Sequence, residues 1–222
     1  MQTQAVSKND SKSPVSKVQK KKESTVFKPS KIRLLTVTAI LGAIAGVIQF
    51  LEFAVPLMPG FIKMDLSDFP ALIASFSLGP ISGVGVCLIK NLIKLLTTTT
   101  AGIGELSNFI LSSIFVVPAG LIYKHKKTRG GAIIAALVGA LSSAILSFFT
   151  NYFIVYPVFT KFMPMEAIIK AYTAILPSVN TLWKALLIFN VPFTFIKGLL
   201  CVLVTFILYK PLSPILKGKK HV

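Results

Sequence analysis

Residues 61–109 read FIKMDLSDFPALIASFSLGPISGVGVCLIKNLIKLLTTTTAGIGELSNF, and this stretch alternates apolar runs with charged and amide side chains. An isolated charge or amide in hydrocarbon costs several kcal/mol, so these groups need polar surroundings. They are Asp65, Asp68, Lys90, Asn91, Lys94, Glu105 and Asn108. The stretch therefore predicts membrane helices around a polar cavity, and we expect that cavity to hold a small polar ligand.

The composition of the whole chain indicates an integral membrane protein. Of its 222 residues, 54% are hydrophobic and 14% are charged, and the mean hydropathy is +0.76, which is too apolar for an ordinary soluble domain. The formal charge of +17 could indicate a nucleic-acid partner, but the basic residues gather at the two ends and in one loop. Because that distribution fixes the orientation of a membrane protein, we expect no nucleic-acid partner.

Apolar runs and helix breakers predict an all-α fold, a polytopic bundle of six transmembrane helices. The expected helices are 34–53, 68–78, 81–97, 105–123, 132–159 and 185–209. About 20 helical residues cross about 30 Å of hydrocarbon. Gly79 and Pro80 end the second helix after about 11 residues. In the connection 160–184, the segment MEAIIKAYTAIL predicts a short amphipathic helix lying at the surface.

The basic residues also predict the topology. We expect a disordered basic tail without a secretory cleavage site at 1–30, a membrane domain at 31–210 and a second basic tail at 211–222. If both termini are cytoplasmic, 17 of the 24 Lys and Arg residues share that side, which favours six helices. Most acidic residues then lie at or near the outer side, so we expect the ligand site to open outward. The N-terminal tail either only fixes this orientation or also contacts anionic membrane lipid.

Four polar side chains each have two interpretations. Lys197 lies about 18 Å from either end of its expected helix. It either forms an ion pair inside the bundle, with Glu105 as the suggested partner, or contacts the ligand. Asn151 either joins helices or contacts the ligand. Lys90 and Lys94, four residues apart on one helix face, either extend to the interface or face the ligand.

Small residues form a stripe along the first expected helix. Ala39, Gly42, Ala43 and Gly46 are spaced by threes and fours, so another helix can approach them closely. The stripe either packs inside the bundle or docks a partner protein. The spacing taken alone favours internal packing.

The sequence lacks motifs for catalysis or metal binding. It contains no Walker, HExxH or GxSxG motif and no paired-cysteine signature. His125 and His221 lie in an expected cytoplasmic loop and next to the last residue. Cys87 and Cys201 lie in apolar runs, which predicts buried thiols rather than a disulfide or a metal site. We therefore expect no enzyme activity, no metal and no cofactor, and a protein that binds a ligand while others supply the energy.

Six blocks in the same order resemble a known family. They are KMDLSDFPALI (63–73), LGPISG (78–83), IKN (89–91), GELSNF (104–109), NYFIVYP (151–157) and PFTFIKG (192–198). Together they resemble the riboflavin-specific substrate-binding component, or S component, of the energy-coupling factor (ECF) transporters of bacteria. The resemblance covers nearly all of residues 31–210.

The resemblance implies a function for the chain. Family members hold the vitamin near the outer face of the plasma membrane, under the loop between the first two helices, here about 54–67. Delivery then needs a transmembrane coupling protein and two ATPase subunits, which hydrolyse ATP. Ala39 and Ala43 match the AxxxA surface that docks the coupling protein, so the resemblance favours docking over internal packing. The open alternatives are an S component for thiamine, pantothenate or a folate, and a structural membrane protein without a ligand.

The resemblance also implies ligand contacts. Asn151 and Lys197 match flavin-binding positions, and Thr194 stands where the family often has Asn. The polar pattern adds Glu105, Asn108 and Lys90 as candidate ligand contacts. Aromatic candidates for contact with the flavin ring are Phe61 and Tyr152, with Phe53 and Tyr156 as further possibilities.

Overall fold

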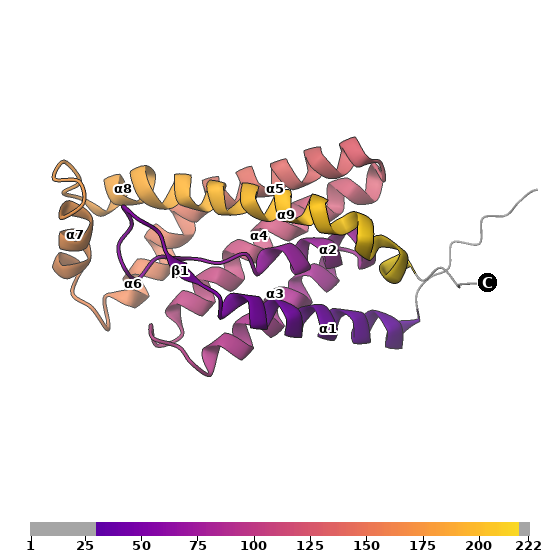
Figure 1. Ribbon diagram of the computed structural model, residues 1–222. Helices are drawn as coiled ribbons and strands as arrows, with labels where there is room; N and C mark the ends of the chain where they lie inside the picture. Colours follow the sequence, from indigo (N-terminus) through magenta and orange to yellow (C-terminus); the bar gives the residue numbers. More distant parts are fainter. Residues whose placement is uncertain (1–29, 218–222) are drawn as a thin grey trace, which may run out of the picture.

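A computed structural model describes residues 30–217 as a bundle of helices with one small sheet (Figure 1). The long helices are α1 (Lys31–Gln49), α2 (Asp68–Leu78), α3 (Pro80–Leu95), α4 (Ile103–His125), α5 (Arg129–Thr150) and α9 (Val191–Lys217). The short helices are α6 (Tyr156–Phe159), α7 (Met165–Thr173) and α8 (Leu182–Ala185). Two π-helical segments, η1 (Asn151–Val155) and η2 (Leu186–Asn190), and two strands, β1 (Phe53–Ala54) and β2 (Lys63–Met64), complete the order.

Local sequence signals set several helix ends. The Ser30 hydroxyl caps α1 by accepting from the Arg33 amide at 3.3 Å, and Thr128 caps α5 by accepting from the Gly131 amide at 3.0 Å. Gly79, with φ 111°, separates α2 from α3, which begins with Pro80. The break predicted at this pair is therefore confirmed.

Four helices in the described part of the chain are long and apolar enough to cross a membrane. They are α1, α4, the continuous run Arg129–Phe159, and the run Leu182–Leu208. With 11 and 16 residues, α2 and α3 rise only about 16 and 24 Å, less than the full hydrocarbon thickness. The helical membrane bundle is confirmed, whereas the count of six spans and the cytoplasmic termini stay predictions.

The last helix is longer than predicted at both ends, and the predicted tails stay predictions. The last helix begins earlier than predicted, at α8, and α9 continues to Lys217 instead of ending at 209. The tail expected at 211–222 thus starts inside a helix, and its last five residues lie outside the described part. Residues 1–29 of the predicted N-terminal tail also lie outside it.

The small-residue stripe of α1 divides between two faces. Gly42 and Gly46 pack against α3, where an added Cβ would lie 2.8 Å from the side chains of Ile89 and Ile93 respectively. Ala39 and Ala43 are exposed on the other side of α1. Internal packing is therefore confirmed for the two glycines, and docking by the two alanines stays a prediction.

The amphipathic helix predicted in the connection 160–184 exists as α7, at one end of the bundle (Figure 1). Its apolar face lies on protein rather than at a free surface: Ile168 and Tyr172 are fully buried and pack with Phe159, Leu186 and Phe189. The predicted amphipathic helix is therefore present, with Glu166 and Lys170 exposed on its other side; contact with the membrane surface stays a prediction. Hydrophobic periodicity is the same whether the apolar side meets lipid or other helices.

Two local features depart from the uniform helices of the prediction. β1 and β2 form an antiparallel ladder, with Phe53 opposite Met64 and Ala54 opposite Lys63, which closes the loop between α1 and α2. The π-helical segments η1 and η2 interrupt the fifth and sixth predicted helices. Such segments frequently occur at functional sites.

Candidate functional site

A cavity of about 530 Å³ lies beneath the loop between α1 and α2, which is in the size range of small-molecule sites. Its polar lining comes from Gln49, Glu52, Lys63, Asp65, Lys94, Thr99, Thr100, Glu105, Ser107, Asn108, Asn151, Asn190 and Thr194. Its aromatic lining comes from Phe61, Tyr156, Phe159 and Phe193. Rings and hydrogen-bonding groups thus line one cavity.

The two π-helical segments bring asparagines to the cavity. Asn151 begins η1 and Asn190 ends η2, and both side chains line the cavity although each residue is more than 90% buried. The Ser107 hydroxyl of α4 donates to Asn151 Oδ1 at 3.4 Å. Because a π-helical turn holds an extra residue, it rotates the side chains that follow relative to a regular helix.

A closed ring of hydrogen bonds joins Asn190 to two tyrosines. Tyr172 donates to Asn190 Oδ1 at 2.7 Å, and Asn190 Nδ2 donates to the Tyr156 hydroxyl at 3.3 Å. The tyrosine hydroxyl oxygens are 2.5 Å apart, and since the proton of Tyr172 goes to Asn190, Tyr156 is the donor between them. The ring fixes the orientation of the Asn190 amide, whose residue lines the cavity.

Aromatic contacts extend this side of the cavity. The ring of Phe61, from the loop, lies 5.8 Å from that of Phe159 and 5.9 Å from that of Tyr172. The Tyr172 ring in turn lies 5.4 Å from Phe189. Of these rings, Phe61 and Phe159 line the cavity, and the rings of Tyr172 and Phe189 pack behind them. A flat apolar ligand would find aromatic contacts on this side.

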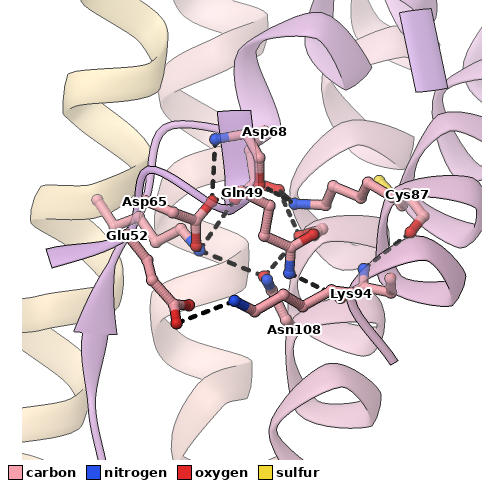
Figure 2. Close-up of polar contacts among 12 residues, drawn as sticks. Gln49, Glu52, Asp65, Asp68, Cys87, Lys94 and Asn108 are labelled. Carbon is pink, nitrogen blue, oxygen red and sulfur yellow. Dashed lines mark hydrogen bonds and ion pairs between the residues drawn. The ribbon is translucent and has the colours of Figure 1, made fainter. Parts of the chain in front are cut away.

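Four charged residues form a buried cluster, which we call the charged cluster: Asp65, Asp68, Lys90 and Lys197. Figure 2 labels its two aspartates. Lys197 Nζ lies 2.8 Å from Asp65 Oδ2 and 3.5 Å from Asp68 Oδ2. Lys90 forms an ion pair with Asp68 and donates to the Ser67 hydroxyl at 2.7 Å. Two cations thus face two anions, which is the condition for burying charge without a large penalty.

The charged cluster decides two of the open interpretations. Lys197 does form an ion pair inside the bundle, but the suggested partner Glu105 was wrong, because the partners are Asp65 and Asp68. Glu105 instead accepts from the hydroxyls of Thr98 and Thr100. Lys90 is fully buried, which excludes one of its two interpretations, extension to the interface; ligand contact stays a prediction.

The charged cluster also anchors the loop. Asp65 directly follows β2, and its carboxylate binds Lys197 of α9. Asn108 Oδ1 accepts from Lys197 at 3.2 Å and from the Ser112 hydroxyl at 3.1 Å, which joins the charged cluster to the cavity wall. The end of the loop is thereby fixed to α4 and α9.

A second, more exposed group of ion pairs joins Glu52, at the start of the loop, to β2 and α3. Glu52 Oε1 accepts from Lys63 Nζ at 2.8 Å and from Lys94 Nζ at 3.0 Å, and Figure 2 shows the bond to Lys94. Burial opposes ionisation of Glu52, but the hydrogen bonds and charges of the two lysines outweigh it and hold its pKa below the ordinary value. Lys94 therefore faces both the cavity and Glu52.

Five of the eight predicted ligand contacts line the cavity: Phe61, Glu105, Asn108, Asn151 and Thr194. Lys197 lies behind Asp65 and Asn108, and Lys90 lies deeper in the charged cluster. Tyr152 is 39% exposed, and its ring stacks on that of Phe148 at 6.0 Å instead of lining the cavity. Ligand contact by any of the eight stays a prediction.

Sequence reasoning missed several polar groups of the site, among them Gln49, Ser107 and Asn190. Asn190 was visible as a lone amide in an apolar run two residues before Pro192, a position where a regular helix is disturbed. Gln49 and Ser107 carry no such signal. Among the described residues, no group of three His, Cys, Asp or Glu side chains could hold a metal ion.

Comparisons with known proteins agree with one another. The family model described as "ECF transporter, substrate-specific component" matches residues 33–209. The riboflavin transporter RibU of Staphylococcus aureus is 31% identical over 83% of this chain and 92% of its own. The riboflavin transporter FmnP of Bacillus subtilis is 30% identical over 83% and 94%. A solved structure described as "Structure and mechanism of the S component of a bacterial ECF transporter" superposes with a TM-score of 0.65 at 28% identity, over 84% of this chain and 98% of that one.

Proposed function

The chain belongs to the family of substrate-specific components of ECF transporters, and on that premise we propose that it binds riboflavin at the outer face of a bacterial cell membrane. Bound riboflavin then passes inward through an ATP-driven coupling module. Riboflavin transport by the relatives in Staphylococcus aureus and Bacillus subtilis supports this choice of vitamin.

The observation that carries the proposal is that the cavity is lined by both aromatic rings and hydrogen-bonding side chains. Riboflavin is neutral, with a flat ring that bears donors and acceptors on one edge and a chain of hydroxyls. Phe61, Phe159 and Tyr156 suit the ring, and Asn151 and Asn190 suit its polar edge. Amides, hydroxyls and charged groups on the remaining wall suit the hydroxyl chain.

Lys197 has a different role from the one implied by the resemblance. Its amine is already bound to Asp65, Asp68 and Asn108. We assign it as a positioning residue that holds the loop and Asn108 in place. Asn151 and Thr194 keep the role of direct flavin contacts. The Thr194 hydroxyl donates to the Asn190 carbonyl at 2.8 Å, so it offers the ligand an acceptor.

The coupling step involves the exposed face of α1 and the end of the bundle away from α7. Ala39 and Ala43 are exposed and small, so a helix of a transmembrane coupling protein can approach α1 there. In Figure 1, the start of α1, the turn between α4 and α5, and the end of α9 lie at the end of the bundle away from α7. The clustered basic residues of these segments support a cytoplasmic location for that end, where two ATPase subunits would act.

Titration of the purified full chain with riboflavin tests the proposal. Saturable quenching of riboflavin fluorescence at one site per chain is the expected result. Thiamine, pantothenate and folate serve as competitors, and none should displace the flavin. Tight binding of one of these vitamins with no binding of riboflavin would refute the choice of ligand.

A further inference from the structure

The charged cluster belongs to a closed circuit of hydrogen bonds, which we call the buried circuit. Its members are Asp65, Ser67, Asp68, Lys90, Asn108, Ser112 and Lys197. In its first half, Lys90 Nζ of α3 donates to the Ser67 hydroxyl at 2.7 Å, and this hydroxyl donates to Asp65 Oδ1. The other carboxylate oxygen of Asp65 accepts from Lys197 of α9 at 2.8 Å. Ser67 thus joins α3 to the end of the loop.

The second half of the buried circuit runs through α4. Asn108 Oδ1 accepts from Lys197 at 3.2 Å and from the Ser112 hydroxyl at 3.1 Å. The same hydroxyl also donates to Asp68 Oδ1, as a bond shared between two acceptors. Asp68 closes the circuit through its ion pair with Lys90. Ser112 thus joins the amide of Asn108 to a buried carboxylate.

Only two members of the buried circuit, Asp65 and Asn108, line the cavity. Ser67 is fully buried and Ser112 is 2% exposed, and neither of them lines it. Each of these hydroxyls bridges two polar groups, so its removal leaves both without one of their hydrogen bonds. Such a loss acts on a ligand indirectly, through the side chains that the hydroxyl holds.

The amide of Asn108 has one fixed orientation. A lysine ammonium only donates, so the atom that faces Lys197 must be the amide oxygen. No described residue accepts a hydrogen bond from Asn108 Nδ2. This nitrogen is accessible to water, because the closed side-chain atoms without a partner in the described part of the chain are Gln49 Oε1, Ser113 Oγ and Thr181 Oγ1. Asn108 therefore keeps a free donor while the buried circuit holds its oxygen.

We propose that Ser67 and Ser112 are positioning residues of the ligand site. Through the buried circuit they orient Asp65 and Asn108, and neither serine touches the ligand. This inference rests on the proposed function and deepens it, because it assigns part of the riboflavin affinity to residues outside the cavity.

Serine-to-alanine variants test the inference against a matched control. Ser75 is also 2% exposed, and its hydroxyl donates to the Val116 carbonyl at 2.7 Å, outside the buried circuit and the cavity lining. Ser67→Ala, Ser112→Ala and Ser75→Ala each remove one buried hydroxyl, so all three should unfold at a lower temperature than wild type. Riboflavin affinity, measured by fluorescence titration of the full chain, should fall about fivefold in the two circuit variants, the equivalent of one hydrogen bond. Ser75→Ala should bind within about twofold of wild type.

A double-mutant cycle shows whether Ser112 acts through Asn108. Asn108→Ala removes the amide that Ser112 holds, so adding Ser112→Ala to it should change riboflavin affinity by less than about twofold. Two losses that simply multiply contradict the inference, and so does wild-type affinity in Asn108→Ala.

The outcomes separate this inference from the proposed function. Equal riboflavin affinities in Ser67→Ala, Ser112→Ala and Ser75→Ala would overturn the positioning role and leave riboflavin binding intact. A wild-type chain that does not bind riboflavin would instead refute the proposed function. If one of the circuit variants fails to fold, the other decides the question against the same control.

Discussion

Replacing Lys197 with Met removes one cation from the charged cluster and leaves Asp65 and Asp68 facing Lys90 alone. The side chains of Lys197 and Asp65 are only 13% and 6% exposed, so water cannot replace the lost partner. Removing one member of a buried ion pair costs about 3–5 kcal/mol. For a chain of this size, that loss lowers the midpoint of thermal unfolding by roughly 10 °C. Thermal unfolding of the purified variant in detergent, without ligand, measures the loss.

A double-mutant cycle separates this electrostatic effect from lost packing. Adding Asp65→Asn to Lys197→Met removes the opposing charge, so the double variant should be more stable than the sum of the single losses implies. Lys170→Met, on the exposed face of α7, is the control and should change stability by about 0.5 kcal/mol or less. If Lys197→Met is as mild as this control, or if the two losses simply add, the charged cluster does not stabilise the fold as argued.

Three further predictions concern ligand binding, docking and pH. Tyr172→Phe removes the hydroxyl that orients Asn190, so riboflavin affinity should fall about tenfold in titrations, whereas Tyr152→Phe should match wild type; equal affinities in the two variants would contradict the role of the hydrogen-bond ring. Ala43→Leu should leave riboflavin affinity unchanged but block co-purification with a coupling module, and normal co-purification would rule out docking on this face. The lowered pKa of Glu52 means that its ion pairs stabilise the fold above the unfolded pKa of about 4.3 and lose that effect as the pH falls through the folded pKa. The difference in unfolding temperature between wild type and Glu52→Gln should therefore shrink from pH 6 to pH 3, and a constant difference would refute the assignment.

Local signals in the sequence were sufficient for the main helices. Gly79 and Pro80 marked a helix break that the structure confirms, because their backbone preferences act within a few residues. The polar groups of residues 61–109 also indicated a cavity, since buried polar side chains need a common location. Four of them, Asp65, Lys94, Glu105 and Asn108, do line it.

Long-range pairing was the part that the sequence could not predict. Lys197 and Asp65 are 132 residues apart, and Glu105 was an equally reasonable partner before the helices were placed. The π-helical turns at Asn151 and Asn190 depend on one extra residue per turn, which hydrophobic periodicity does not resolve. The partner of the apolar side of α7 could not be predicted, because the spacing of its apolar residues is the same whether they meet lipid or Tyr156 and Phe159.

The ion pairs that hold the loop between α1 and α2 differ greatly in their exposure to water. A ladder of two residue pairs joins β1, near its start, to β2. The ion pair of Lys63 with Glu52 has side chains that are 38% and 20% exposed, and ion pairs exposed to water contribute little to stability. At its end, Asp65 is held by buried charge. Since β2 directly precedes Asp65, the ladder attaches the start of the loop to the residue that the buried ion pair fixes to α9, so one anchor serves both ends of the loop.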